Sequence, residues 1–377
     1  MQLRRVAVGA VVVGLLRVAD AAGEPIVNLN LHSFSDSRQN RVDSYLLEVQ
    51  QPASPTWTMQ LRGILDRVHL PPLPGLPGSQ ENVDAITAAS RPVQSAAASK
   101  DSYLKQRKEL TGSVAWHPAE GALRGGGSYY ISHESDFLGQ QASLDLGRDW
   151  AQGSTSLAAR FAYGYDRITP DEHTGGDPTA QSRNTADVTV TCTQSLTPRL
   201  QGQIGAEVTS IRGFQNNPYR KVYAGGNILP EHHPEERLRR AVFAQVDRYF
   251  GTRSSVSLNA RWYSDDWGVH AGSIDTRFNQ YVGDRFIVRY RYRFHTQSGA
   301  WFYRDLYEVG DGVDGYRTAD YKLRGLDSNL FGVKVSVPFE GTYPWLDGMV
   351  LDVKYERYFD SRNFAANVLE AGCSWPF

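Results

Sequence analysis

Residues 285–295 alternate without a break between apolar or aromatic side chains and mostly cationic ones. One parity holds Phe286, Val288, Tyr290, Tyr292 and Phe294, and the other holds Arg285, Ile287, Arg289, Arg291, Arg293 and His295. Because side chains alternate faces along a strand, this segment predicts a strand with one aromatic face and one cationic face. Similar alternation continues to the end of the chain. Strands of this kind predict a closed barrel in a membrane, with lipid outside and a polar lumen inside.

About 16 segments fit this pattern, an even number as single-chain bacterial barrels require. They cover residues 27–32, 43–49, 57–68, 110–116, 123–132, 141–147, 156–166, 185–194, 200–211, 241–250, 256–263, 270–281, 286–295, 330–339, 349–359 and 369–377. The prediction is an all-β fold, a transmembrane antiparallel up-and-down β-barrel. The long links then fall on one side, at residues 70–107, 167–183, 212–239 and 296–329. Short turns face the periplasm in such barrels, so we expect the long links to be extracellular loops.

The two ends of the chain indicate a compartment. Residues 1–21 resemble a signal peptide, because Arg4 and Arg5 precede a short apolar run and Ala19-Asp20-Ala21 offers a cleavage site. The barrel is then expected over residues 22–377. The last strand runs through Trp375 to a terminal Phe377, which resembles the signal read by the bacterial barrel assembly machinery. We therefore expect export to a Gram-negative outer membrane, with membrane lipid and that machinery as partners.

The charged residues are balanced overall but concentrated on the inward face. Lys plus Arg (40) nearly equals Asp plus Glu (41), so there is no broad basic field for nucleic acid. Charges inside the strands must face water or one another. The inward candidates are Arg261, Asp275, Arg277, Arg289, Arg291, Arg293, Lys354 and Glu356. The row formed by Arg289, Arg291 and Arg293 is either an anion-attracting strip in a pore or a structural row neutralised by acids such as Asp275.

Candidate chemistry at the expected extracellular rim is confined to short clusters. Asp265, Asp266 and Trp267, with His270 close behind, form either an acid/His pair that activates water or a turn in which Trp267 anchors at the membrane interface. We favour the turn, because the second carboxylate pair that this chemistry needs is missing. His232 and His233 are weak metal candidates, because adjacent histidines seldom chelate one ion well. No cofactor-binding motif is found in a plausible context, and we expect no metal site and no cofactor.

Five segments in combination resemble the bacterial domain-of-unknown-function family 3570. They are HESDFLG at residues 133–139, YDRITP at 165–170, NNPYR at 216–220, RWYSDDWG at 261–268, and residues 290–303. The resemblance spans nearly all of the chain after the signal segment. It implies a barrel-forming protein with no established activity. Relatives often sit beside genes for flavin-transferase and thioredoxin-like proteins, which implies an exported redox system. The resemblance adds Asn216, Asn217 and Tyr219 to the rim candidates.

Three functions are compatible with these patterns. The first is a porin-like channel for a small polar or anionic solute. The second is a non-conducting barrel scaffold that docks an exported redox partner, and the third is a hydrolase at the extracellular rim. A lumen filled by paired charges favours docking, an open lumen favours transport, and a convergent carboxylate/His site at the rim favours catalysis.

Overall fold

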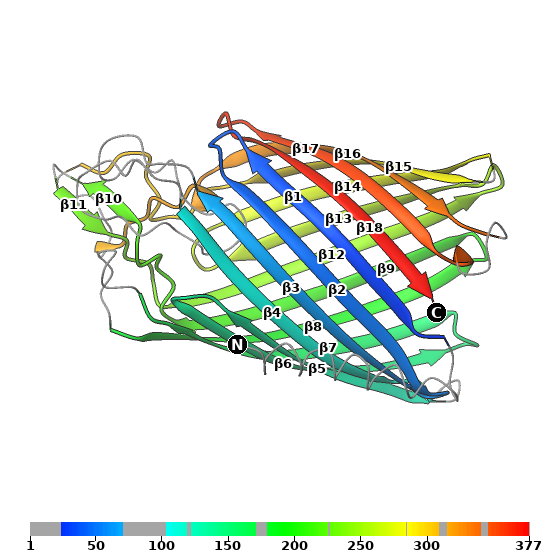
Figure 1. The fold of residues 1–377 in the computed structure, drawn as a ribbon. Coiled ribbons are helices and arrows are strands. Elements are labelled where there is room, and N and C mark those ends of the chain that lie inside the picture. The colour runs from blue at the N-terminus through cyan, green and yellow to red at the C-terminus, as the bar shows by residue number, and fades with distance from the viewer. Residues whose placement is uncertain are drawn as a thin grey trace, which may run out of the picture.

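The computed structural model describes residues 24–70, 103–118, 122–170, 179–224, 227–283, 285–308, 315–340 and 346–376. In these residues, sixteen antiparallel strands form one closed barrel (Figure 1). The expected signal peptide, most of the 70–107 loop and the terminal Phe377 lie outside the described residues. Among the residues described, no helix is long and apolar enough to cross a membrane.

The strands follow chain order around the barrel. They are β1 (Ile26–Asp36), β2 (Arg41–Ser54), β3 (Trp57–Leu70), β4 (Tyr103–Trp116), β5 (Leu123–His133), β6 (Phe137–Trp150), β7 (Thr155–Ile168), β8 (Gln181–Thr197), β9 (Leu200–Gly213), β12 (Glu236–Phe250), β13 (Ser254–Asp265), β14 (His270–Val282), β15 (Phe286–Gln297), β16 (Leu326–Pro338), β17 (Val350–Asp360) and β18 (Ala365–Pro376). Strand β9 pairs with β12, and β1 pairs with β18 to close the barrel. The predicted 16-stranded antiparallel barrel is confirmed.

Several strands are longer than the alternation predicted. Strand β4 begins at Tyr103 and β12 at Glu236, inside the ranges expected as loops. The residues by which these strands are extended are polar on both faces, as in the run from Lys105 to Lys108. Hydrophobic alternation arises only where one face meets an apolar environment, so it cannot mark a strand end that is polar on both faces.

The outer wall is apolar over most of its height. On β15, Tyr290, Tyr292 and Phe294 are exposed, while Arg291 and Arg293 between them are less exposed and point inward. An exposed apolar surface that surrounds the whole molecule would be a liability in water. It is the surface that a transmembrane barrel presents to lipid.

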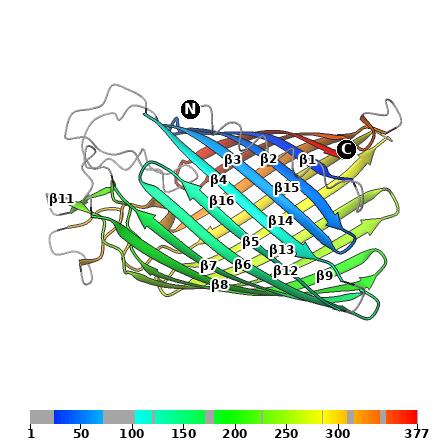
Figure 2. The ribbon, with the colours of Figure 1, turned by 60° about the horizontal axis from the view of Figure 1, so that its bottom comes forward.

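The two ends of the barrel differ, as Figures 1 and 2 show. The chain enters β1 and leaves β18 at one end, where Ile26 pairs with Pro376. This is the turn end, and it also holds the tight link between β8 and β9. The opposite end is the loop end, which holds the links after β3, β7, β9 and β15.

At the loop end, two long links pack into one folded body. The link after β9 contains the hairpin β10 (Lys221–Ala224) and β11 (Asn227–Pro230), and the link after β15 contains a 3-10 helix at Tyr321–Leu323. Backbone bridges join the links at two points, Ala224 with Tyr307 and His232 with Arg317. We call the described parts of residues 214–235 and 298–325 the loop unit.

Candidate functional site

Arg291 lies at the centre of a charge network on the inner wall. Its Nη2 donates to Asp275 Oδ2 at 2.5 Å, and its Nη1 donates to Glu356 Oε1 at 2.9 Å. The second contact crosses strand β16 at Gly332, which is in register with both Arg291 and Glu356. A Cβ on Gly332 would lie 2.9 Å from Glu356 Cγ. The missing side chain therefore lets the two charged groups meet across a strand. Arg277 Nε also donates to Asp275, at 3.1 Å.

The other two arginines of the row have no such partners. Arg289 Nε donates to the amide oxygen of Asn279 at 2.7 Å. In the part of the chain that the structure describes, neither Arg289 nor Arg293 has a carboxylate oxygen within 4.0 Å. The nearby lysines are paired, Lys334 with Asp352 at 2.9 Å and Lys354 with Glu370 at 2.6 Å. Within the described ranges, the middle arginine of the row is therefore neutralised, and the guanidinium groups of Arg289 and Arg293 on either side of it have no carboxylate partner.

Some inward charges elsewhere are also paired, yet they keep contact with solvent. Arg261 Nη2 lies 3.1 Å from Glu207 Oε1, and Arg160 Nη1 lies 3.3 Å from Asp145 Oδ1. The Arg160 side chain is 45% exposed and the Arg277 side chain 44% exposed. Both point into the barrel, so the space that they face is open to solvent.

At the rim, Asp265 has a structural role. Its carboxylate is fully buried and accepts hydrogen bonds from Arg237 Nε at 2.9 Å, Tyr263 Oη at 2.7 Å and the Val269 amide at 2.9 Å. The side chain of Asp265 points inward with Tyr263, whereas His270 is in register with Ser264 on the outward parity. The structure therefore does not bring Asp265 and His270 together. Asp266 accepts the Leu238 amide at 3.0 Å, as expected for a turn.

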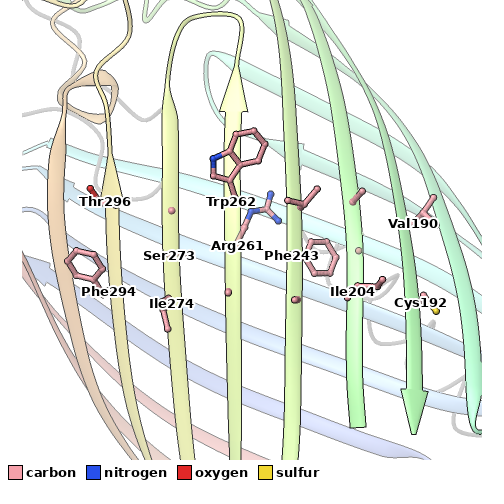
Figure 3. Close-up of a pocket in the computed structure, with 16 residues that line it drawn as sticks. Val190, Cys192, Ile204, Phe243, Arg261, Trp262, Ser273, Ile274, Phe294 and Thr296 are labelled. Atoms are coloured by element: carbon pink, nitrogen blue, oxygen red, sulfur yellow. The ribbon is translucent and has the colours of Figure 1, made fainter. Parts of the chain in front are cut away.

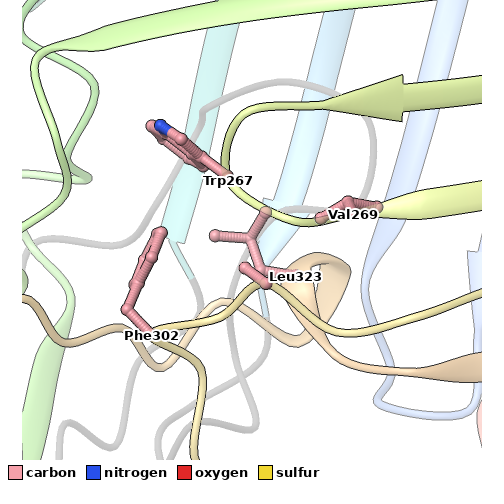
Figure 4. Close-up of a cluster of buried hydrophobic side chains, with 5 residues drawn as sticks. Trp267, Val269, Phe302 and Leu323 are labelled. Carbon is pink, nitrogen blue, oxygen red and sulfur yellow. The ribbon is translucent and has the colours of Figure 1, made fainter. Parts of the chain in front are cut away.

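The prediction that Trp267 anchors at the lipid interface is wrong. Trp267 is 3% exposed and packs with Val269, Ala300, Phe302 and Leu323 (Figure 4). Its indole Nε1 donates to the Glu236 carbonyl at 2.9 Å. The residue meets the apolar core of the loop unit instead of lipid, because the link after β15 folds over this hairpin. The sequence could not show that a distant loop covers it.

Two of the recognised motifs meet at a polar pocket inside the loop-end mouth. Tyr219 Oη donates to Asp136 Oδ2 at 2.7 Å, joining the NNPYR segment to the HESDFLG segment. Lys105 Nζ lies 2.8 Å from both Asp136 Oδ1 and Glu134 Oε2. All three ionised side chains are nearly buried. The cavity beside them measures about 260 Å³, and Asn216 and other side chains line it.

Glu231 joins the two links of the loop unit. Its carboxylate accepts Thr318 Oγ1 at 2.8 Å and the Ala319 amide at 2.9 Å, and it lies 3.2 Å from Arg220 Nη1. The backbone N–H of Asn217 also donates to this carboxylate, at 3.3 Å. Burial alone raises the pKa of the carboxyl, but the Arg220 guanidinium and hydrogen bonds from neighbouring groups outweigh burial and lower the pKa to about 2. Glu231 therefore stays ionised at the centre of the loop unit.

The two histidines considered as metal ligands have separate partners. The His232 ring packs on Tyr316, with centroids 4.8 Å apart. The backbone N–H of His233 donates to Asn216 Oδ1 at 2.6 Å, and the His233 ring packs on Trp267. In the described ranges, no group of three or more His, Cys, Asp or Glu side chains is arranged to hold a metal ion.

Sequence reasoning missed Lys105, Glu134, Asp136 and Glu231 as members of the rim network, and Gly332 as the gap that joins Arg291 to Glu356. The HESDFLG and NNPYR segments contained a signal for Asp136, because both are polar motifs at strand tips on one side of the barrel. For Gly332 there was no signal in the sequence, since its role depends on strand register.

A closed, ion-paired barrel with an apolar outer wall and a packed loop unit at one mouth defines the class of outer-membrane β-barrel proteins. Within this class, the chain belongs to the family described as "Protein of unknown function (DUF3570)", whose model matches residues 16–368. No curated protein matches the chain.

Solved outer-membrane barrels are distantly similar. The siderophore receptor PirA from Pseudomonas aeruginosa is 9% identical with a TM-score of 0.44, and the match covers 90% of this chain and 56% of PirA. A mutant of the ferric enterobactin receptor PfeA from the same organism is 12% identical with a TM-score of 0.44, covering 90% of this chain and 53% of that one. The chain thus spans about half the length of these receptors. OccK1 (OpdK) from P. aeruginosa is 10% identical with a TM-score of 0.38, covering 94% of this chain and 98% of that one.

Proposed function

We propose that the protein is a water-filled channel of the outer membrane that passes small polar solutes and favours anions. The observation that carries the proposal is the solvent exposure of inward arginines. Arg277 and Arg289 point into the barrel from β14 and β15 and remain exposed. A guanidinium in that position is stable only in contact with water or an anion. A barrel of about 16 strands is wide enough for an aqueous channel.

The arrangement of charge favours anions. Asp275 and Glu356 are nearly buried beside Arg291, and Arg277 and Lys354 also contact them, so their negative charge is neutralised. Arg289 and Arg293 flank this pair without a carboxylate among the described residues. A cationic surplus on a low-dielectric wall raises the local concentration of anions. In this proposal the signal peptide exports the chain, the assembly machinery inserts it, and the loop end faces the exterior.

Planar-bilayer recordings of the refolded protein test the proposal. In a salt gradient, we expect stable conductance and a reversal potential that indicates anion preference. The double variant Arg289→Gln/Arg293→Gln should lower the anion-to-cation permeability ratio by about twofold or more, since it removes two luminal charges. Arg148→Gln is the matched control, because Arg148 is an exposed arginine on the outward parity of β6 and carries the same charge.

Two results would contradict the proposal. Unchanged selectivity in the double variant would show that these arginines do not set ion preference. A correctly folded barrel without conductance would refute the open channel and favour the scaffold that docks an exported redox partner.

A further inference from the structure

The outer wall carries a shallow apolar groove of about 860 Å³ over β8, β9 and β12 to β15 (Figure 3). Its floor consists of small outward residues, Ala206, Ala244, Ala260 and Gly272. Large exposed side chains flank the floor, including Ile204 at 64%, Trp262 at 51% and Ile274 at 50%. The floor is low because these four residues have no side chain beyond Cβ. The groove therefore lies on the face that meets lipid.

A row of polar side chains borders the groove on its loop-end side. Strand register places Arg240 beside Ser264 and Ser264 beside His270. The next row toward the turn end is Val242, Trp262 and Gly272, which all line the groove. Residues two apart on one strand face are separated by roughly 7 Å. Arg240 and His270 therefore lie roughly 7 Å from the apolar floor, on the side of the loop end.

Arg240 has no ion-pair partner among the described residues, although Asp266 bonds the Leu238 backbone two residues away. Among the described residues, no carboxylate oxygen lies within 4.0 Å of its guanidinium. The nearest outward acid on the same strand is Glu236, four residues away, and Glu236 is paired with Arg212 at 3.7 Å. A cation above an apolar groove is complementary to a lipid with an anionic headgroup. Trp262 lies in the adjacent row with Val242 and Gly272, directly below the polar row, at the level that suits an amphipathic ring in the interface.

We infer that this groove is a binding site for lipid A, a phosphorylated glycolipid with several acyl chains. Arg240 and His270 are two strand spacings apart, roughly 10 Å, so they can contact two separate phosphates. The groove spans six strands, roughly 25 Å, which is wider than a two-chain phospholipid needs. The loop end is expected to face the outer leaflet. The inference goes beyond the proposed channel, since every residue that it uses lies on the outer wall.

Native mass spectrometry of the refolded barrel in detergent tests the inference. Protein incubated with lipid A should retain one lipid molecule. Arg240→Gln/His270→Gln should weaken retention by about tenfold or more, as expected for the loss of charge-assisted hydrogen bonds. Ala244→Phe should also weaken retention, because it fills the floor. Arg248→Gln should not, although Arg248 is an exposed arginine on the same face of the same strand at the turn end.

Three outcomes would overturn the inference. If Arg248→Gln lost as much lipid A retention as Arg240→Gln/His270→Gln, the lipid would be held by diffuse attraction to the barrel surface. Equal retention of phosphatidylglycerol would show that any anionic lipid suffices. Unchanged retention in Ala244→Phe, with correct folding shown by circular dichroism, would show that acyl chains do not lie in the groove. Conductance of these variants in phospholipid alone should match that of the parent protein, so a failure here is distinguishable from a failure of the channel proposal.

Discussion

Replacing Arg291 with alanine should destabilise the barrel more than replacing any other arginine of its row. Among the described residues, Arg291 is the one cation that contacts both Asp275 on the neighbouring strand β14 and Glu356 two strands away on β17. Both carboxylates have side chains only 9% exposed. Removal of the guanidinium leaves two nearly buried acids. Among the described residues, Asp275 then keeps its contact with Arg277 at 3.1 Å, and Glu356 keeps its longer contact with Lys354 at 3.9 Å.

The magnitude follows from the two contacts that are lost. Removing one partner of a buried ion pair costs roughly 3–5 kcal/mol. The Arg291 side chain is 22% exposed, so water in the lumen can reach the vacated site and relieve part of that cost. We therefore expect a loss of about 3 kcal/mol in the free energy of unfolding. Arg289→Ala should cost under about 1 kcal/mol, because Arg289 is exposed and contacts only an amide.

Urea unfolding in lipid vesicles, followed by tryptophan fluorescence, measures both values. The slope with urea should not change, because the native surface is the same. A triple variant, Arg291→Met/Asp275→Asn/Glu356→Gln, should recover much of the stability, since it leaves no nearly buried charge without a partner. Arg277 loses its carboxylate partner in this variant, but its side chain is 44% exposed and stays in contact with water. A loss below about 1 kcal/mol in Arg291→Ala would refute the reasoning and indicate that water fully solvates the two acids.

Two further predictions concern the loop unit and a close glycine contact. The pKa of Glu231 is lowered to about 2 from an ordinary value of 4.5, so its stabilising effect is complete above about pH 4.5 and is lost as the pH falls toward 2. The protection factor of the Ala319 amide, its exchange rate relative to the intrinsic rate at the same pH, should therefore fall across that window. Glu231→Gln should show low protection at every pH, and high protection in the variant would contradict the assignment. Gly205→Ala should cost about 1–3 kcal/mol in vesicle unfolding, because its Cβ would lie 2.3 Å from the Phe243 ring, and Gly205→Ala/Phe243→Leu should recover part of that loss.

The fold was predictable because lipid and lumen impose opposite demands on alternate residues. Tyr290 and Arg291 are neighbours in the chain but meet different environments, and that contrast is visible in the sequence. The contrast disappears near Lys105, where both faces of the strand are polar and the inward face meets buried ion-pair partners, and the strand end there was missed. Trp267 was misplaced for a related reason. Its environment comes from Phe302 and Leu323, which lie in a loop that no local pattern connects to it.

The luminal site could be predicted only as a set of residues, because ion pairing depends on register across strands. From the sequence, the row of three arginines had two interpretations, a strip that attracts anions or a structural row neutralised by acids. The register of β15, β16 and β17 aligns Arg291, Gly332 and Glu356. The missing side chain at Gly332 thus lets Glu356 join Asp275 at the middle arginine of the row. The two interpretations apply to different members of one row, and the proposed channel depends on the two members that the acids do not reach.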